Sequence, residues 1–142
     1  MKGFNQLQKS LRSLDRDVDD VIKSTLLEYM QKILNEAKAN LPSGASSVAN
    51  SYHLTVSDSG YQVNIWTENE IAAYIEFGTG DYAEAYLRTQ EDEVLEEAIK
   101  FYVTGEGNMP ARPYLFPAYD KYKFEIPIEI NKRIQKLLNN VA

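Results

Sequence analysis

The stretch Met109–Ala118, which reads Met-Pro-Ala-Arg-Pro-Tyr-Leu-Phe-Pro-Ala, decides how the second half of this chain is organised. Each of its prolines, at positions 110, 113 and 117, fixes φ and removes a backbone donor, so the stretch is predicted to be neither helix interior nor central strand. It also carries the densest bulky apolar triplet of the chain, at 114–116. We expect such a stiff, extended segment to lie against another part of the protein and to direct the helix that follows it.

That C-terminal helix is predicted from apolar residues at 122, 126, 130, 134, 137 and 141. Their spacing by threes and fours is typical of one helical face. The phase continues across Pro127, which predicts a kinked helix, because a break and restart would usually lose the register.

A second long stripe precedes it, with apolar residues at 7, 11, 14, 18, 22, 26, 29, 33 and 37 and no proline or glycine until Pro42. This predicts a helix over residues 7–41, about 50 Å long at 1.5 Å per residue. Such a helix is long for a small domain. Its stripe is expected either to cover a sheet end to end or to project and pack against another chain, and a break near Ser13–Asp20 remains open.

Two runs of alternating apolar and polar residues, 52–57 and 61–66, flank Asp58-Ser59-Gly60 and predict a β-hairpin with one apolar face. His53 falls on the polar face and is expected at the surface. Residues 69–79 predict a short helix that begins after Asn69 and leads into an extended stretch over Glu76–Thr79. Gly78 and Gly80 are interpreted as backbone-geometry residues, because the motif of a phosphate-binding loop is absent.

Charge is unevenly distributed along the chain. Residues 81–108 hold two bases and eight acids and include a predicted acidic helix, whereas residues 109–142 hold six bases and three acids. The two regions are expected to attract each other within a chain or between copies, although an ordinary solvated acidic face is the simpler alternative. The candidate subunit-interface residues are Glu91, Asp92, Glu93, Glu96, Glu97, Lys121, Lys123, Lys132 and Arg133.

Composition restricts the function. The chain of 142 residues has no cysteine and one histidine, so a thiolate nucleophile, a disulfide framework and a multi-histidine metal site are excluded. No apolar run exceeds five residues, so no membrane span is expected. The prediction is a single α+β domain over 1–142, with an insertion at 81–108. In it the long N-terminal helix and the kinked C-terminal helix pack on a small antiparallel sheet built around the hairpin.

Two motifs in the order found here resemble one family, the tail-component or neck proteins of tailed bacteriophages, lambda gpZ-like tail-completion proteins among them. Its members typically show Tyr-x-Glu-Phe-Gly-Thr and, after a variable insertion, (Met/Ala)-Pro-Ala-Arg-Pro-Phe-Leu-x-Pro-Ala before a C-terminal helix. The matching positions are Tyr74, Glu76, Phe77, Gly78, Thr79, Pro110, Ala111, Arg112, Pro113, Leu115, Pro117 and Ala118, with Tyr114 in place of the usual Phe. The long acidic insertion and Pro127 depart from the pattern.

The resemblance implies a structural, non-enzymatic virion protein of the head–tail neck, without cofactor or metal, which completes the tail end and joins it to the connector. It implies a homo-oligomeric ring, a hexamer or dodecamer, that contacts other neck, connector and tail-tube proteins. DNA would pass only as cargo and no membrane is involved. Localisation would be the virion, after assembly in the cytoplasm of the bacterial host.

Three further interpretations concern individual residues and the function class. Arg112, framed by prolines, is expected to pair with Glu76 or else to be simply solvated. Two other function classes stay open. One is a cellular helical interaction module whose first helix forms a coiled coil. The other is a metal-dependent hydrolase that uses Glu76 and an acid of the 91–97 cluster.

Overall fold

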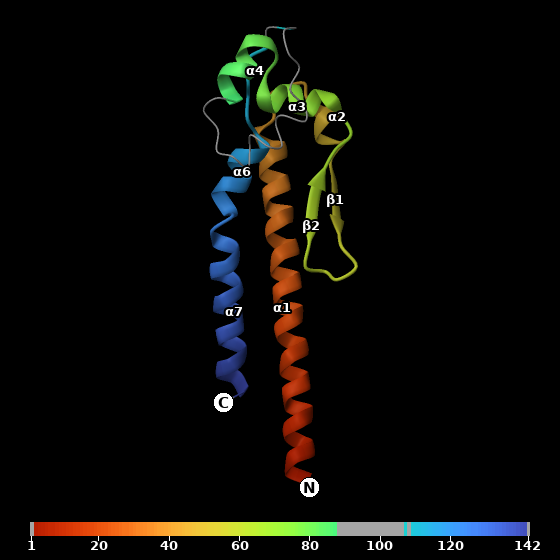
Figure 1. Cartoon of the computed structure of the whole chain (residues 1–142), viewed down its shortest axis with the longest axis vertical. Helices are drawn as coiled ribbons and strands as arrows, with labels where there is room; N and C mark the ends of the chain where they lie inside the picture. Colours follow the sequence, from red (N-terminus) through yellow and green to blue (C-terminus); the bar gives the residue numbers. More distant parts are fainter. Residues whose placement is uncertain (1, 88–106, 108, 142) are drawn as a thin grey trace.

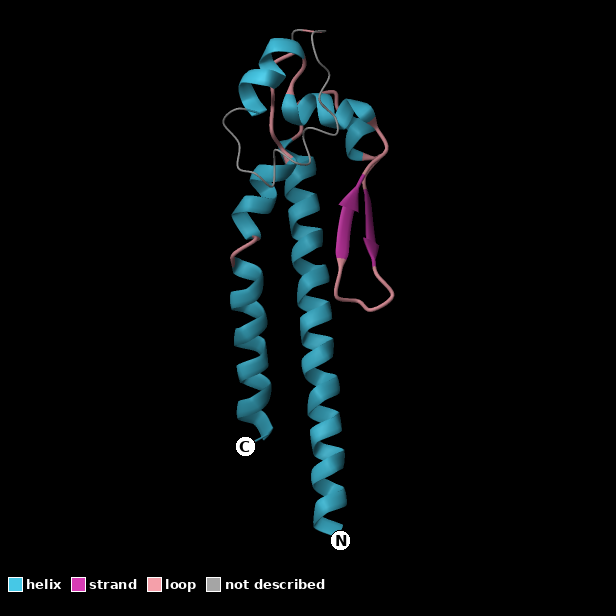
Figure 2. Cartoon of the chain, in the orientation of Figure 1, coloured by secondary structure: helices cyan, strands magenta, loops and turns pink. Residues whose placement is uncertain are grey.

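Two long helices and one hairpin dominate the computed structural model, which describes residues 2–87, 107 and 109–141 (Figure 1). Within the described ranges, strands are confined to the hairpin, and helices make up most of the rest (Figure 2). The predicted α+β fold, with a long N-terminal helix, a kinked C-terminal helix and a small antiparallel sheet, is confirmed, although α7 lies alongside α1 and on the other side of it from the hairpin (Figure 1). In chain order the elements are α1 (Lys2–Asn40), α2 (Ser46–Ala49), β1 (His53–Val56), β2 (Val63–Trp66), α3 (Glu70–Phe77), α4 (Gly80–Leu87), α6 (Leu115–Tyr122) and α7 (Glu125–Val141).

Helix α1 runs without interruption for 39 residues, so the break that the sequence left open near 13–20 does not occur. Its C-terminal half buries Tyr29, Ile33, Leu34 and Ala37. Its N-terminal turns extend beyond the end of α7, which runs alongside it (Figure 1). There the stripe is exposed, because Phe4, Leu7 and Leu11 keep 57, 56 and 56% of their surface accessible. The N-terminal turns of α1 therefore project, and their packing against another chain stays a prediction.

The hairpin pairs β1 with β2 in antiparallel register, Leu54 opposite Ile65 and Val56 opposite Val63. The predicted apolar set thus lies on one face. The connection is wider than the three residues expected, since the Ser57 N–H donates to the Gln62 carbonyl at 2.9 Å. His53 is exposed on the other face, where its ring lies 4.5 Å from that of Trp66.

Helix α3 begins as predicted, with the Asn69 side chain accepting the Ile71 N–H at 3.0 Å. It continues through Phe77 before Gly78 ends it, so the expected extended stretch from Glu76 is wrong. The Asn69 cap and the apolar positions of the helix outweigh the strand-like alternation in this stretch.

The C-terminal helix is kinked, and the interruption falls between α6 and α7, just before Pro127. Proline at 127 has no N–H to donate to the Lys123 carbonyl and its ring clashes with that carbonyl, so the helix breaks at this turn. Helix α6 begins at Leu115, inside the proline stretch. The stretch is therefore extended only up to the start of α6, and Pro117 is tolerated there because it occupies the first turn of the helix, where no N–H is needed.

The core lies where α1, α2, α3 and α6 meet. Its buried members are Ile33, Ala37, Val48, Ala72, Ile75, Tyr114 and Ala118. Tyr114 is fully buried, which confirms that the proline stretch docks on the rest of the protein. Among the described helices, none combines the length and the apolar character that crossing a membrane requires.

Candidate functional site

The first motif anchors the second through a buried carboxylate. Glu76, only 3% exposed, accepts the backbone N–H groups of Tyr114 at 2.8 Å, Leu115 at 3.0 Å and Phe116 at 3.1 Å. These groups open α6, and the next residue is Pro117, which has no N–H. Glu76 thus caps a helix that lies far from it in sequence, and the negative charge also suits the positive end of the helix dipole.

The expected Arg112–Glu76 ion pair does not form. The Arg112 side chain is exposed, and its backbone N–H donates to the Ile75 carbonyl at 2.7 Å. Burial raises the pKa of Glu76 above its ordinary value, and the three N–H donors oppose that rise by stabilising the charged form. With both oxygens occupied, Glu76 serves structure, and the interpretation as a hydrolase carboxylate loses its main residue.

The two motifs also join along their backbones. The Thr79 N–H donates to the Met109 carbonyl at 2.9 Å, and the Met109 N–H donates to Thr79 Oγ1 at 2.9 Å. Gly78 makes this approach possible, because its φ is +79° and a Cβ there would lie 2.8 Å from the Ala111 nitrogen. Gly78, predicted to be a backbone-geometry residue, is therefore required both for its positive φ and for the close approach of the Ala111 backbone.

Tyr114 ties three elements together. Its hydroxyl donates to the Ala72 carbonyl of α3 at 3.2 Å and forms a short hydrogen bond with the hydroxyl of Tyr52. Burial raises the pKa of Tyr114 and of Tyr52, so both stay protonated and can donate. The usual Phe of the motif would fill the same space without these bonds.

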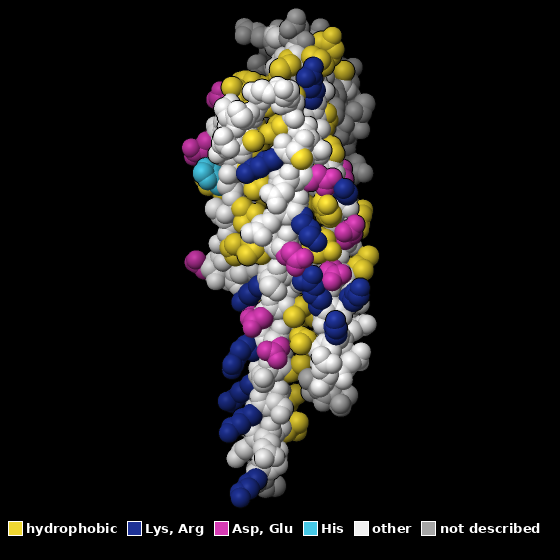
Figure 3. All heavy atoms as spheres, turned by 180° about the vertical axis from the view of Figure 1, so that it is seen from behind, with side chains coloured by type: hydrophobic (Ala, Val, Ile, Leu, Met, Phe, Trp, Pro, Cys, Tyr) yellow, Lys and Arg dark blue, Asp and Glu magenta, His cyan; other side chains and the backbone are white. Residues whose placement is uncertain are grey.

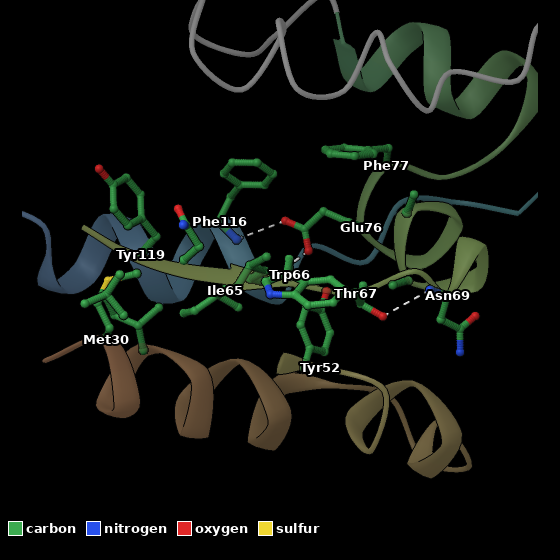
Figure 4. A pocket seen from close by; sticks show the side chains of 16 residues that line it. Met30, Tyr52, Ile65, Trp66, Thr67, Asn69, Glu76, Phe77, Phe116 and Tyr119 are labelled. Atoms are coloured by element: carbon green, nitrogen blue, oxygen red, sulfur yellow. Dashed lines mark hydrogen bonds between the residues drawn. The ribbon is translucent and has the colours of Figure 1, made fainter. Parts of the chain in front are cut away.

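Next to this junction, a pocket of 440 Å³ opens between α1, β2, α3 and α6 (Figure 4). Its wall is mainly apolar and includes Met30, Tyr52, Ile65, Phe116 and Tyr119. Volume and lining are typical of a binding site. Sequence reasoning missed this pocket, because its wall comes from four elements whose relative placement no single motif reveals.

Three of the four predicted basic interface residues form ion pairs within the chain. Lys121 lies 2.7 Å from Glu36, Lys123 lies 3.0 Å from Asp120, and Arg133 contacts Glu28 at 2.8 Å. Arg133 also contacts Glu129 and the buried Thr25 hydroxyl, so it joins α7 to α1. The fourth, Lys132, is exposed. The acidic candidates at 91–97 lie outside the described residues.

The N-terminal end of α1 forms a distinct surface, here named the α1 tip and comprising residues 2–16. Lys and Arg side chains gather along one edge of this end of the helix, and apolar side chains lie along the opposite edge (Figure 3). The basic residues are Lys2, Lys9, Arg12 and Arg16, against a single acid, Asp15.

Chemically, this arrangement can hold segments together and bind apolar groups. Among the residues that the structure describes, no cluster of three or more His, Cys, Asp or Glu side chains could hold a metal ion. The fold and the site define a class of elongated helical protein with an exposed apolar helical surface and an apolar pocket.

Comparison with family models places the chain more closely. Residues 5–78, just over half of the chain, match the family described as "Bacteriophage HK97-gp10, putative tail-component". The chain belongs to this HK97 gp10-like family. Searches of curated proteins and of solved structures gave no match.

The matched region extends from the α1 tip to Gly78 and thus contains the Tyr-x-Glu-Phe-Gly motif, while the proline stretch lies outside it. Membership supports a phage tail-related protein, with a role in the virion that is structural rather than catalytic. The same membership implies contacts with other phage structural proteins.

Proposed function

We propose that the protein is a tail-completion protein of the head–tail neck, comparable to gpZ of phage lambda, and that it assembles as a homo-oligomeric ring between connector and tail tube. The observation that carries assembly is the α1 tip. Phe4, Leu7 and Leu11 form an exposed apolar stripe on a rigid helix, and apolar stripes of this kind usually mark protein–protein contacts. Membership in a family of tail components supports the station in the virion.

A salt-sensitive contact is part of this proposal. The acids at 91–97 of one subunit would face the basic side of α6 and α7 of the next, where Lys132 forms no ion pair with any described residue. Such a heterologous contact generates a ring when its rotation closes. Assembly is then expected to weaken as salt rises, because exposed charges are screened.

The test uses the phage that encodes this chain. Deletion of the gene should leave filled heads and complete tails that do not join, and adding the purified protein to the mixed lysate should restore joined particles in electron micrographs. Gold-labelled antibody should mark the head–tail junction of wild-type particles. Label along the tail tube or at the distal tip would refute the neck station, even if the protein is a virion component.

A further inference from the structure

The α1 tip carries two stripes that face in opposite directions. Phe4, Leu7 and Leu11 form the apolar stripe. The second, here named the basic stripe, follows the same steps of three and four and consists of Lys2, Asn5, Lys9, Arg12 and Arg16. At 3.6 residues per turn the centres of the two stripes lie about 150° apart around the helix. A partner that covers the apolar stripe therefore leaves the basic stripe exposed.

The bases of this stripe have no partner within the described part of the chain. All four are exposed, and none forms an ion pair or a hydrogen bond with a described residue. Farther along α1 the same face is occupied, because Lys23 pairs with Asp19 at 2.7 Å and its Nζ lies 5.1 Å from the centre of the Tyr61 ring on the hairpin. The basic stripe thus ends at Asp19 and Asp20, where the hairpin begins to cover the helix.

Positive charge is concentrated at this end of an acidic molecule. The α1 tip holds four bases and one acid, Asp15, whereas the rest of the chain holds 11 bases and 20 acids. The tip projects beyond both α7 and the hairpin (Figure 1). Exposed charges more than about 8 Å apart are largely screened at physiological salt, so the acids of the body scarcely weaken the field at the outer part of the stripe. A polyanion is therefore attracted to the tip and repelled by the body.

The shape of the basic stripe favours duplex DNA among the possible polyanions. The stripe is straight and runs about 21 Å from Lys2 to Arg16 at 1.5 Å per residue, the length of about six base pairs. It contains no apolar residue, and phosphate contacts are made by Lys, Arg and Asn side chains without an apolar anchor. A protein partner would usually add an apolar core to the contact. A lipid bilayer would take up the apolar stripe and so turn the bases away.

We propose that the basic stripe of the α1 tip binds the phosphate backbone of duplex DNA without reading its sequence. Phe4, Leu7 and Leu11 then stay available for the protein contact of the proposed assembly. The inference goes beyond the proposed function, which gives the tip a protein partner only. Since the contact needs one exposed helical face, it is testable on the purified chain whether or not that chain forms a ring.

The test is fluorescence anisotropy of a labelled duplex of about 20 base pairs, titrated with the purified protein over a range of salt concentrations. Neutralising four phosphates predicts a slope of about −3.6 in log K against log salt, which is a loss of affinity of about 150-fold between 50 and 200 mM salt. Arg12→Gln with Arg16→Gln halves the number of bases. Its slope should fall to about −1.8 and its affinity at 50 mM salt by at least about tenfold. A duplex of unrelated sequence should bind equally well.

Two control variants separate this face from the rest of the molecule. Lys132→Gln with Lys136→Gln removes the same charge from exposed positions on α7 and should leave both slope and affinity unchanged. Leu7→Gln with Leu11→Gln removes the apolar stripe and keeps every base, so it should still bind DNA.

Several outcomes would overturn the inference. They are the absence of binding at 50 mM salt, an equal loss in the arginine and lysine double variants, and a salt slope that Arg12→Gln with Arg16→Gln leaves unchanged. Binding to phosphatidylserine vesicles that is tighter than binding to DNA would assign the tip to a membrane instead. Self-association that the arginine variant weakens, without any DNA binding, would place the bases against a second copy.

The result is also distinct from that of the proposed function. DNA binding with the expected slope, by a protein that antibody locates away from the head–tail junction, would keep this inference and refute the neck station. A junction label without DNA binding would do the reverse.

Discussion

The Glu76→Gln substitution tests the central junction most directly. Hydrogen bonds to a charged group each contribute about 1.5–3 kcal/mol, and a buried donor left without an acceptor costs about 1–3 kcal/mol. Glutamine can keep its carbonyl oxygen at the position that serves Tyr114 and Leu115, but its amide then faces the Phe116 N–H. One hydrogen bond is lost, and the other two now have a neutral acceptor in place of a charged one. We therefore expect a loss of about 2–4 kcal/mol in unfolding free energy. Against the 5–15 kcal/mol of a typical domain, this loss is large.

Urea denaturation, followed by far-UV circular dichroism, measures this difference at constant m-value. Glu68→Gln, an exposed acid beside α3, is the matched control and should change stability by less than about 0.5 kcal/mol. A loss below about 1 kcal/mol for Glu76→Gln would refute the reasoning, since the opening N–H groups of α6 would then be satisfied without the carboxylate.

The same pair of proteins yields a pH dependence. Burial raises the folded-state pKa of Glu76 above its ordinary 4.5, so the resulting stabilisation is fully present below pH 4.5 and declines as pH rises through the raised pKa. The stability advantage of wild type over Glu76→Gln should therefore shrink from acidic to neutral pH. Taking the difference cancels the titration of other groups. An advantage that grows over this range would mean that the N–H donors outweigh burial and lower the pKa.

Three further predictions concern the surroundings of this junction. Gly78→Ala should lower the free energy of unfolding by at least about 3 kcal/mol in thermal denaturation, because it combines a positive φ with a backbone clash. The control Gly44→Ala, with a similar φ but open space around its Cβ, should lower it by only about 1–2 kcal/mol. Equal losses would contradict the close approach of Gly78 to Ala111. Tyr114→Phe should cost about 1–2 kcal/mol in urea denaturation, because it removes the hydroxyl from two hydrogen bonds; an unchanged midpoint would show that those bonds contribute nothing. The hydrogen bond from Arg133 lowers the pKa of Glu28, so the stabilisation that Glu28 contributes is present above pH 4.5 and lost as pH falls through the lowered pKa. The melting temperature of Glu28→Gln should therefore fall less steeply with acid than that of wild type. Melting temperatures that fall in parallel for the two proteins would contradict this.

Local patterns predicted the elements of this fold well, and long-range partners poorly. The stripe of α1, the alternation of the hairpin and the Asn69 cap each depend on neighbours within a few residues, so the sequence determines them directly. The partner of Glu76 could not be read this way. A carboxylate and an arginine in paired motifs suggest an ion pair. The start of α6, just after Arg112, however holds three backbone N–H groups that are buried and must have an acceptor, whereas the Arg112 side chain can be solvated by water.

One signal could have corrected that interpretation. Pro117 suits the first turn of a helix, and the residues just before it have no side chain suited to capping. Together these features indicate a helix whose first N–H groups need an acceptor from another part of the chain. The placement of Lys121 and Arg133 was beyond any such signal, because their partners Glu36 and Glu28 are set by how α6 and α7 pack on α1.

The backbone bond between Thr79 and Met109 has a consequence for how this protein can vary. Residues 80–108 leave and rejoin the fold at two points held 2.9 Å apart, so the junction beneath them is closed independently of what lies between. The entropy of closing a loop grows only logarithmically with its length, by about 0.6 kcal/mol per doubling. The chain can therefore accept segments of very different length at this one place, and a foreign peptide or small domain inserted there should be displayed at the end of the molecule opposite the α1 tip.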